Sequence, residues 1–270
     1  MLMNRSILSA LLLVSACVSL SAQWLDYRTP GIPRTPDGKP NLTAPAPKMP
    51  DGKPDLSGLW RVVRADARPG RPLYDLNTIV PGGIQMTPEA NEITARRAPF
   101  DSKERAIEPK PNCLPQGPVL DDYDIGSRLV QTPTLLLQLM DWNKAYRIVY
   151  LDGRSLPTVV EPTWDGYSVG HWDKDTLVVE TIGLNGKPWM DIHGHPTSES
   201  TKLTERYHRD DFGHLTLQIT VEDPTLYTKP WTATFNKVFV ADTEMLDQIC
   251  AEGEKDIKHI QKANEAGANK

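Results

Sequence analysis

From residue 128 to residue 240 the chain is a succession of strand-length apolar runs separated by turn residues. Two of the separating turns are 173–175 (Asp-Lys-Asp) and 210–213 (Asp-Asp-Phe-Gly). Consecutive strands joined by loops this short form antiparallel hairpins. With a first strand near Trp60, the pattern predicts eight or nine strands. We expect them at 57–63, 129–131, 134–140, 145–151, 167–172, 176–182, 203–209, 214–221 and 231–240.

The run 214–221 shows how such a strand is packed. Leucine, isoleucine and valine occupy its odd positions, whereas threonine and glutamine occupy even positions. A strand of this kind has one packed face and one face toward water or a ligand. Closing the strands into a barrel removes exposed edges, and about eight strands enclose room for side chains or one small ligand. We therefore predict a mainly β fold, an antiparallel up-and-down β-barrel with short peripheral helices; the alternative is a β-sandwich.

The first 22 residues have the composition of an export signal. Arg5 supplies a positive charge, and residues 6–21 are almost all small or apolar, a run too short to span a bilayer as a mature helix. Cleavage after Ala22 would release a soluble protein. Alternatively, the lipobox at 14–17 would make Cys17 a lipidated first residue. We expect an exported protein, periplasmic or extracellular, and in the second case a lipoprotein tethered to the outer membrane.

The segment before the barrel divides into two parts. Residues 23–56 form a proline-rich arm or tether, in which Pro-Asp-Gly-Lys-Pro occurs at 36–40 and again at 50–54. Pro-Asp-Gly is turn chemistry. Residues 57–127 hold the first strand and an irregular, partly helical insertion, with one helix from Pro88 to about Arg97.

The barrel body and a C-terminal helix are expected over 128–260, and a flexible tail over 261–270. The helix would begin near Ala241, with Asp242 or Thr243 as its cap. The net charge of −5 gives no nucleic-acid footprint, and no second apolar run approaches the length of a transmembrane helix.

After removal of the leader the chain keeps Cys113 and Cys250. In an oxidising compartment two cysteines form a plausible disulfide bond, which would join the proline-rich half to the C-terminal segment. Two buried thiols are the alternative, because the distance in sequence says nothing about the distance between the Cα atoms.

Several motifs together resemble an uncharacterised family of exported bacterial proteins. They are Asp55–Trp60, Cys113–Pro115, Arg147–Arg154, Pro162–Ser168, Gly170–Thr181, Thr204–Tyr207, Glu222–Pro224 and Tyr227–Trp231. The resemblance marks both mature cysteines as family features and so favours the bridge, but it implies no activity. Where the family pattern has Pro-His-Ser-Glu, this chain has Thr197, so any role of that histidine is absent or falls to His195. Separately, residues 58–60 (Gly-Leu-Trp) resemble the Gly-x-Trp start of lipocalins and imply a lipocalin- or calycin-like barrel.

The stretch 189–199 is the richest in chemically active side chains. Asp191, His193 and His195 alternate, so an extended backbone would point all three the same way. With Glu199 they could bind zinc. We favour a polar loop instead and expect no metal and no cofactor.

The same stretch suggests a catalytic site. Asp191 and Glu199 could serve as general acid and base, with Arg206 facing a developing negative charge. The alternative is that Glu205 and Arg206 only pair with neighbouring strands, which is ordinary on a sheet. Whether the protein is an enzyme stays open at this point.

Aromatic and charged residues of the strand region suggest a ligand pocket. An arginine inside a barrel must be paired, so Arg147 would need a carboxylate such as Glu180 or an anionic ligand. Indole and phenol groups suit an apolar pocket with a few polar groups, although a packed core is the alternative. The candidate ligand-binding residues are Arg147, Tyr150, Trp164, Tyr167, Trp172, Glu180, Tyr207 and Trp231.

We therefore predict an exported β-barrel that binds a small, partly apolar ligand in its interior. The second hypothesis is a hydrolase or lyase acting at the barrel mouth through paired carboxylates. The third is a structural, surface-associated accessory protein. We expect a small-molecule partner, no nucleic acid, and contact with a membrane only through a lipid on Cys17.

Overall fold

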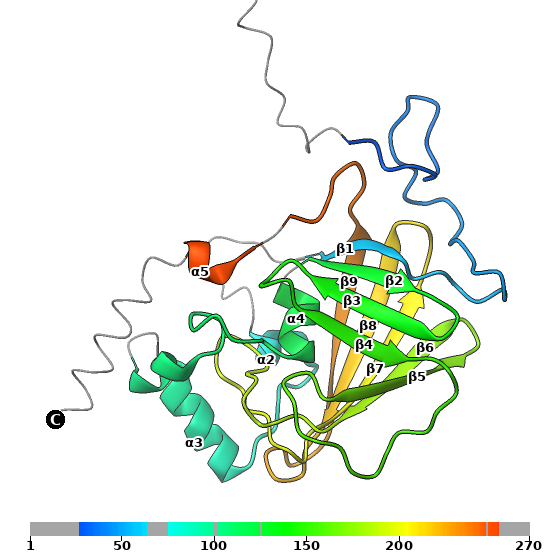
Figure 1. Cartoon of the computed structure of the whole chain (residues 1–270). Helices are drawn as coiled ribbons and strands as arrows, with labels where there is room; N and C mark the ends of the chain where they lie inside the picture. The colour runs from blue at the N-terminus through cyan, green and yellow to red at the C-terminus, as the bar shows by residue number, and fades with distance from the viewer. Residues whose placement is uncertain (1–26, 64–74, 100–101, 125, 247, 254–270) are drawn as a thin grey trace, which may run out of the picture.

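The computed structural model describes residues 27–63, 75–99, 102–124, 126–246 and 248–253. The expected export signal, with Cys17, lies outside these residues. Nine strands close into one barrel in chain order, and Figure 1 shows their arrangement. The strands are β1 (Gly58–Val62), β2 (Ser127–Gln131), β3 (Leu135–Met140), β4 (Tyr146–Tyr150), β5 (Tyr167–Asp173), β6 (Thr176–Ile182), β7 (Lys202–Arg209), β8 (His214–Glu222) and β9 (Trp231–Phe239). The predicted closed β-barrel is confirmed.

One junction of the barrel departs from the predicted antiparallel pattern. Eight of the nine neighbouring pairs are antiparallel, whereas β4 and β5 are parallel. An odd number of strands requires this, because strands that alternate in direction around a ring close only when their number is even. The parallel pair falls where a long connection, residues 151–166, returns the chain to the end of the barrel at which β4 began (Figure 1).

Side chains fill the inside of the barrel. In β8 the odd-numbered residues are buried, as the alternation predicts. The buried core includes large side chains from many strands, among them Trp60, Leu136, Leu177, Leu217 and Phe235. Removal of this apolar surface from water is the main driving force for closing the wall.

The helices are short and lie outside the barrel wall or at its end. They are α2 (Leu76–Ile79), α3 (Pro88–Arg97), the 3-10 helix η1 (Lys103–Ile107), α4 (Pro118–Asp124) and α5 (Cys250–Gly253). Helix α3 confirms the prediction, and the Thr87 hydroxyl caps it by accepting from the Ala90 amide at 3.3 Å. In the part of the chain that the structure describes, no helix is both long and apolar enough to cross a membrane.

The predicted start of the C-terminal helix is wrong. Helix α5 begins at Cys250, not at Ala241. Asp242 has a φ of +57°, in the left-handed region, so it does not begin a helix. Its carboxylate instead pairs with Arg34 at 2.6 Å and accepts from the Thr29 amide at 2.9 Å.

The described part of the N-terminal arm, residues 27–56, is fastened to the barrel. The amides of Phe212 and Gly213, in the β7–β8 turn, donate to carbonyl groups of the arm at 2.8 and 2.7 Å. The two Pro-Asp-Gly-Lys-Pro copies fold into the same small loop, since Gly38 and Gly52 have φ values of +83° and +84°. A repeated turn thus lets a proline-rich segment lie against the barrel without forming a ladder.

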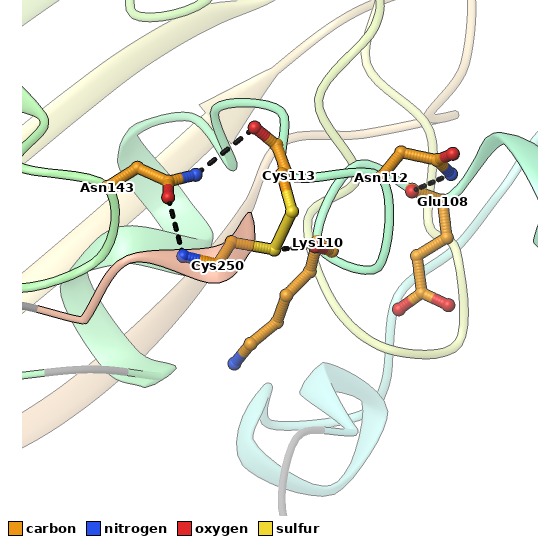
Figure 2. The surroundings of a disulfide bond; sticks show 6 residues. All are labelled: Glu108, Lys110, Asn112, Cys113, Asn143 and Cys250. Atoms are coloured by element: carbon orange, nitrogen blue, oxygen red, sulfur yellow. Dashed lines mark hydrogen bonds between the residues drawn. A yellow bond between two sulfur atoms is a disulfide. The ribbon is translucent and has the colours of Figure 1, made fainter. Parts of the chain in front are cut away.

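Cys113 and Cys250 form a disulfide bond, with 5.4 Å between their Cα atoms (Figure 2). Figure 2 also shows how the Asn143 side chain joins both cysteines: its amide donates to the Cys113 carbonyl at 3.1 Å, and its oxygen accepts from the Cys250 amide at 3.0 Å. The bond fastens the C-terminal segment to the loop that precedes α4. The predicted bridge is confirmed, and the alternative of two free thiols is wrong.

Candidate functional site

A pocket of about 280 Å³ lies where β4 and β5 meet, which we call the β4–β5 pocket. These strands share only two paired positions, Val149 with Ser168 and Tyr150 with Val169. The lining residues are Tyr146, Arg147, Ile148, Tyr150, Thr163, Asp165, Gly166, Tyr167 and Ser168. The pocket is therefore a consequence of the parallel junction in the wall.

The connection between the two strands keeps this junction open. Residues 151–166 contain Pro157 and Pro162, which have no amide hydrogen for a ladder. The end of the connection pairs with the other neighbour of β5 instead: the Thr163 amide donates to the Gly183 carbonyl at 2.9 Å, just beyond β6. The backbone that could have continued the β4–β5 ladder thus forms its hydrogen bond with the residue after β6 instead.

Gly166 lies where the 151–166 connection passes close to the end of β6. A Cβ atom at this position would lie 2.5 Å from the carbonyl oxygen of Ile182, the last residue of β6. The φ of Gly166 is +67°, in the region that favours glycine. Only glycine allows the connection to pass this close and place the next residues in the pocket wall.

Arg147 forms the floor of the pocket and is 3% exposed. All three nitrogens of its guanidinium donate to barrel groups: Nη1 to Glu205 at 2.8 Å, Nε to Ser168 at 3.2 Å, and Nη2 to Thr181 at 2.8 Å. A second contact joins Nη2 to the other Glu205 oxygen. Burial alone would lower the pKa of Arg147, but the Glu205 carboxylate outweighs burial and raises that pKa.

The carboxylate partner of Arg147 is thus Glu205, and the suggestion of Glu180 was wrong. Glu180 is exposed on the outer face of β6, because Val179 and Thr181 on either side of it point inward and are buried. Glu205 is fully buried in β7, across the barrel from β4. The pair neutralises the buried charge of Arg147 without any ligand.

A second buried ion pair continues this network. Asp122 of helix α4 accepts from Lys237 of β9 at 2.6 Å and from Gln138 of β3 at 2.9 Å. The Tyr207 hydroxyl donates within reach of both acids, 2.9 Å from Glu205 and 3.2 Å from Asp122. Burial first, then these two carboxylates, raise the pKa of Tyr207. The sequence does not reveal this arrangement, because the three aspartates of α4 look like surface residues.

Asp165 is half-buried and, unlike the buried acids Asp122 and Glu205, its side chain has no hydrogen bond within the described residues; its Oδ1 atom is buried. Burial raises the pKa of the Asp165 carboxyl, and the positive charge of Arg147 only partly opposes this. Sequence analysis did not single out Asp165. The available signal was its position two residues before the start of β5, where a side chain can lie at the end of the barrel wall.

Tyrosine rings form the rim of the pocket. Tyr150 and Tyr167 stack with 5.3 Å between their centroids, and Tyr146 is 63% exposed. The Arg154 guanidinium lies 3.8 Å from the centroid of the Tyr150 ring and donates to the Tyr167 hydroxyl at 2.9 Å. Asp152 in turn pairs with Arg154 at 2.6 Å. Arg147, Tyr150 and Tyr167, three of the predicted ligand-binding residues, therefore come together here.

The predicted catalytic residues are not brought together. Asp191 is fully buried and accepts from the Leu76 amide at 3.1 Å and from His195 Nδ1 at 2.7 Å. Arg206 lies on the outer face of β7, where it pairs with Asp173 at 2.9 Å. Glu199 is exposed. Asp191 thus holds its own loop to the first residue of α2, and Arg206 faces the outside of the barrel wall.

His195 also has its two ring nitrogens occupied. The Asn77 side-chain oxygen accepts from the Ile84 amide at 3.0 Å, so its amino group faces His195 Nε2 at 3.0 Å and donates to it. The Nδ1 atom therefore has the proton that is donated to Asp191. Within the described ranges no three His, Cys, Asp or Glu side chains are grouped as metal ligands would be.

The remaining predicted aromatic residues lie apart from the pocket lining. Trp164 precedes Asp165 and is half-buried, and Tyr207 is buried in the network described above. Trp231 is buried against Tyr227, with 5.7 Å between their ring centroids. Trp172 packs against the core near the other end of β5, where Lys53 of the arm lies 6.0 Å from its ring centroid.

A second pocket, of about 310 Å³, lies on the outer face of β6, β7 and β8. We call it the outer cleft; its residues are Thr176, Arg206, His208, Asp210, Thr216 and Gln218. It has no aromatic side chain apart from the histidine ring and no buried acid. Comparisons with known proteins do not separate the two pockets: no family model matches the chain, and no curated protein or solved structure is significantly similar to it.

Proposed function

We propose that this protein is an exported binding protein for a small, partly apolar ligand, and that the ligand binds in the β4–β5 pocket. The single observation behind the proposal is that tyrosine rings and an acid without a hydrogen bond line a pocket at the one parallel junction of the barrel. Sites for small molecules combine an apolar or aromatic lining with a few placed polar groups.

The location follows from how the barrel is packed. Large buried side chains occupy the inward-facing positions among the described residues, and the pocket reaches toward the interior at its floor, at Arg147 and Ser168. The aromatic rings of Tyr150 and Tyr167 provide the apolar contact at the rim. We therefore propose that the ligand binds at the barrel wall and not in the barrel centre, where the sequence predicted it.

The test is native mass spectrometry of protein purified from its own host. We expect a retained small molecule in the wild type and its loss in Tyr167→Ala. The matched control is His208→Ala in the outer cleft, which leaves the retained mass unchanged. A wild-type protein without any bound mass, or equal retention in both variants, would contradict the proposal.

Export is the second part of the proposal and is tested separately. It is supported by the apolar leader and is compatible with the disulfide bond, which is typical of proteins outside the cytoplasm. Cell fractionation should find the mature chain outside the cytoplasm. Metabolic labelling with a fatty acid, repeated on Cys17→Ala, distinguishes a lipoprotein from a freely soluble product.

A further inference from the structure

The β4–β5 pocket has an unbalanced negative charge. Arg147 and Glu205 form one ion pair, and Arg154 and Asp152 form another, so four of the five charged groups that the described residues place in the lining or in contact with it cancel. The fifth is Asp165, which has no ion pair and no hydrogen bond among the described residues. A partly buried carboxylate left in this state is unfavourable until a donor or a cation reaches it.

Arg147 cannot supply what Asp165 lacks. Its three nitrogens already donate to Glu205, Ser168 and Thr181, which hold the guanidinium toward the inside of the barrel. For the same reason Arg147 is a poor receptor for an anionic ligand, since its charge is balanced by Glu205. No described residue therefore supplies the partner that Asp165 lacks, and a ligand in the pocket can supply it.

The tyrosine rim favours a cationic ligand, as Asp165 does. The faces of tyrosine rings are negative and attract cations. Tyr150 already has a cation on one face, because the Arg154 guanidinium lies 3.8 Å from its ring centroid. Tyr146, also in the lining, is largely exposed and free of stacking contacts in the described structure.

We propose that the ligand of the β4–β5 pocket is an organic ammonium compound: its protonated amine pairs with Asp165, and its apolar body lies on the tyrosine rings. This inference rests on the proposed function, since it names the chemical class of the ligand for that same pocket. A neutral polyhydroxylated ligand would also supply hydrogen-bond donors to Asp165, but it would gain nothing from the net negative charge.

The experiment compares three probes of nearly the same shape, 2-phenylethylamine, 2-phenylethanol and 3-phenylpropionate, by isothermal titration calorimetry at pH 7. We expect the amine to bind about tenfold or more tightly than the alcohol, and the carboxylate to bind least, because an ion pair at a partly buried site outweighs a neutral hydrogen bond. Asp165→Asn should remove the preference for the amine. Asp210→Asn, which removes an exposed acid of the outer cleft, should leave it unchanged.

Equal affinity for amine and alcohol, a preference for the carboxylate, or an amine preference that survives in Asp165→Asn would overturn the inference. Because the comparison of probes on the wild type needs no variant, the test holds even if Asp165→Asn folds poorly. A neutral molecule retained from the host and lost in Tyr167→Ala would sink the ammonium inference but leave the proposed function standing. Absence of any retained molecule and of any probe binding would end both.

Discussion

The two sides of the barrel are built differently. On one side β8 pairs with β7 over eight residue positions and with β9 over eight more. On the other side β4 and β5 share two. On the closed side β8 buries a row of leucine, isoleucine and valine, whereas the open side has a polar floor and a tyrosine rim. A barrel with an odd number of strands must have one parallel junction, and here the candidate site lies at that junction.

The largest expected effect comes from the ion pair that spans the barrel. Arg147 lies on the open side and Glu205 on the closed side, and both are almost completely buried. Glu205→Gln leaves the arginine charge without a counter-charge and should lower the free energy of unfolding by about 3–5 kcal/mol. Urea denaturation followed by tryptophan fluorescence measures this.

The exposed pair between Arg206 and Asp173 is the control. Asp173→Asn should leave the free energy of unfolding nearly unchanged, because solvent screens a surface pair. Equal losses in the two variants would mean that burial does not strengthen the Arg147–Glu205 pair.

The second prediction compares apolar packing on the two sides. Leu217 of β8 is fully buried between Tyr207 and Phe235. Leu217→Ala should lower the free energy of unfolding by about 2–5 kcal/mol. Ile148→Ala, at the edge of the pocket, removes a partly exposed side chain and should lower it by only about 1 kcal/mol. Similar losses would show that the open side is packed as firmly as the closed side.

The third prediction concerns the connection that holds the junction open. Gly166→Ala introduces a Cβ atom 2.5 Å from the Ile182 carbonyl oxygen, at a residue with positive φ. We expect a loss of about 2–3 kcal/mol in unfolding free energy, together with weaker binding at the pocket. Gly153→Ala is the matched control: its φ is +82°, but nothing lies within 4 Å of the added atom. At Gly153 only the cost of placing alanine at a positive φ should remain, which is a loss of about 1 kcal/mol in unfolding free energy.

Much of the fold could be predicted because its strands alternate or are bounded by turns. The expected strand 176–182 agrees with β6 residue for residue. The parallel junction could not be predicted, because the sequence left the number of strands at eight or nine. Eight alternating strands close without a parallel pair, whereas nine require one. The position of helix α4 could not be predicted either. Its Asp122 can be buried because it pairs with Lys237, which is more than a hundred residues away in the chain.

The candidate site was predictable in part. Alternation in β4 places Arg147 inside the barrel, and an arginine there requires a partner. The choice of that partner depends on register: in β6 the run Leu177, Val178, Val179 is apolar on both faces, so the sequence does not reveal that Glu180 points outward. Asp165 lies in an irregular connection without periodicity, and its burial arises only when the connection packs against β6.

The only expected gain in stability comes from Asp165→Asn. In the native state burial raises the pKa of this carboxyl above the value in the unfolded chain, which is about 4. A carboxyl with a raised native pKa favours folding while it is protonated, and that contribution is lost as the pH rises through the native pKa. Asparagine has no such loss, so the variant should be more stable than the wild type by about 1 kcal/mol at pH 7, and the difference should vanish near pH 3, where both side chains are neutral. Urea denaturation at the two pH values measures this. A variant less stable than the wild type at pH 7 would mean that Asp165 already has a stabilising partner.

Binding of 2-phenylethylamine should show the opposite pH trend to the stability of the wild-type protein. It should weaken as the pH falls through the native pKa of Asp165, because the proposed ion pair needs the ionised acid. The acid that makes the open side of the barrel less stable is then the group that gives it affinity for a ligand.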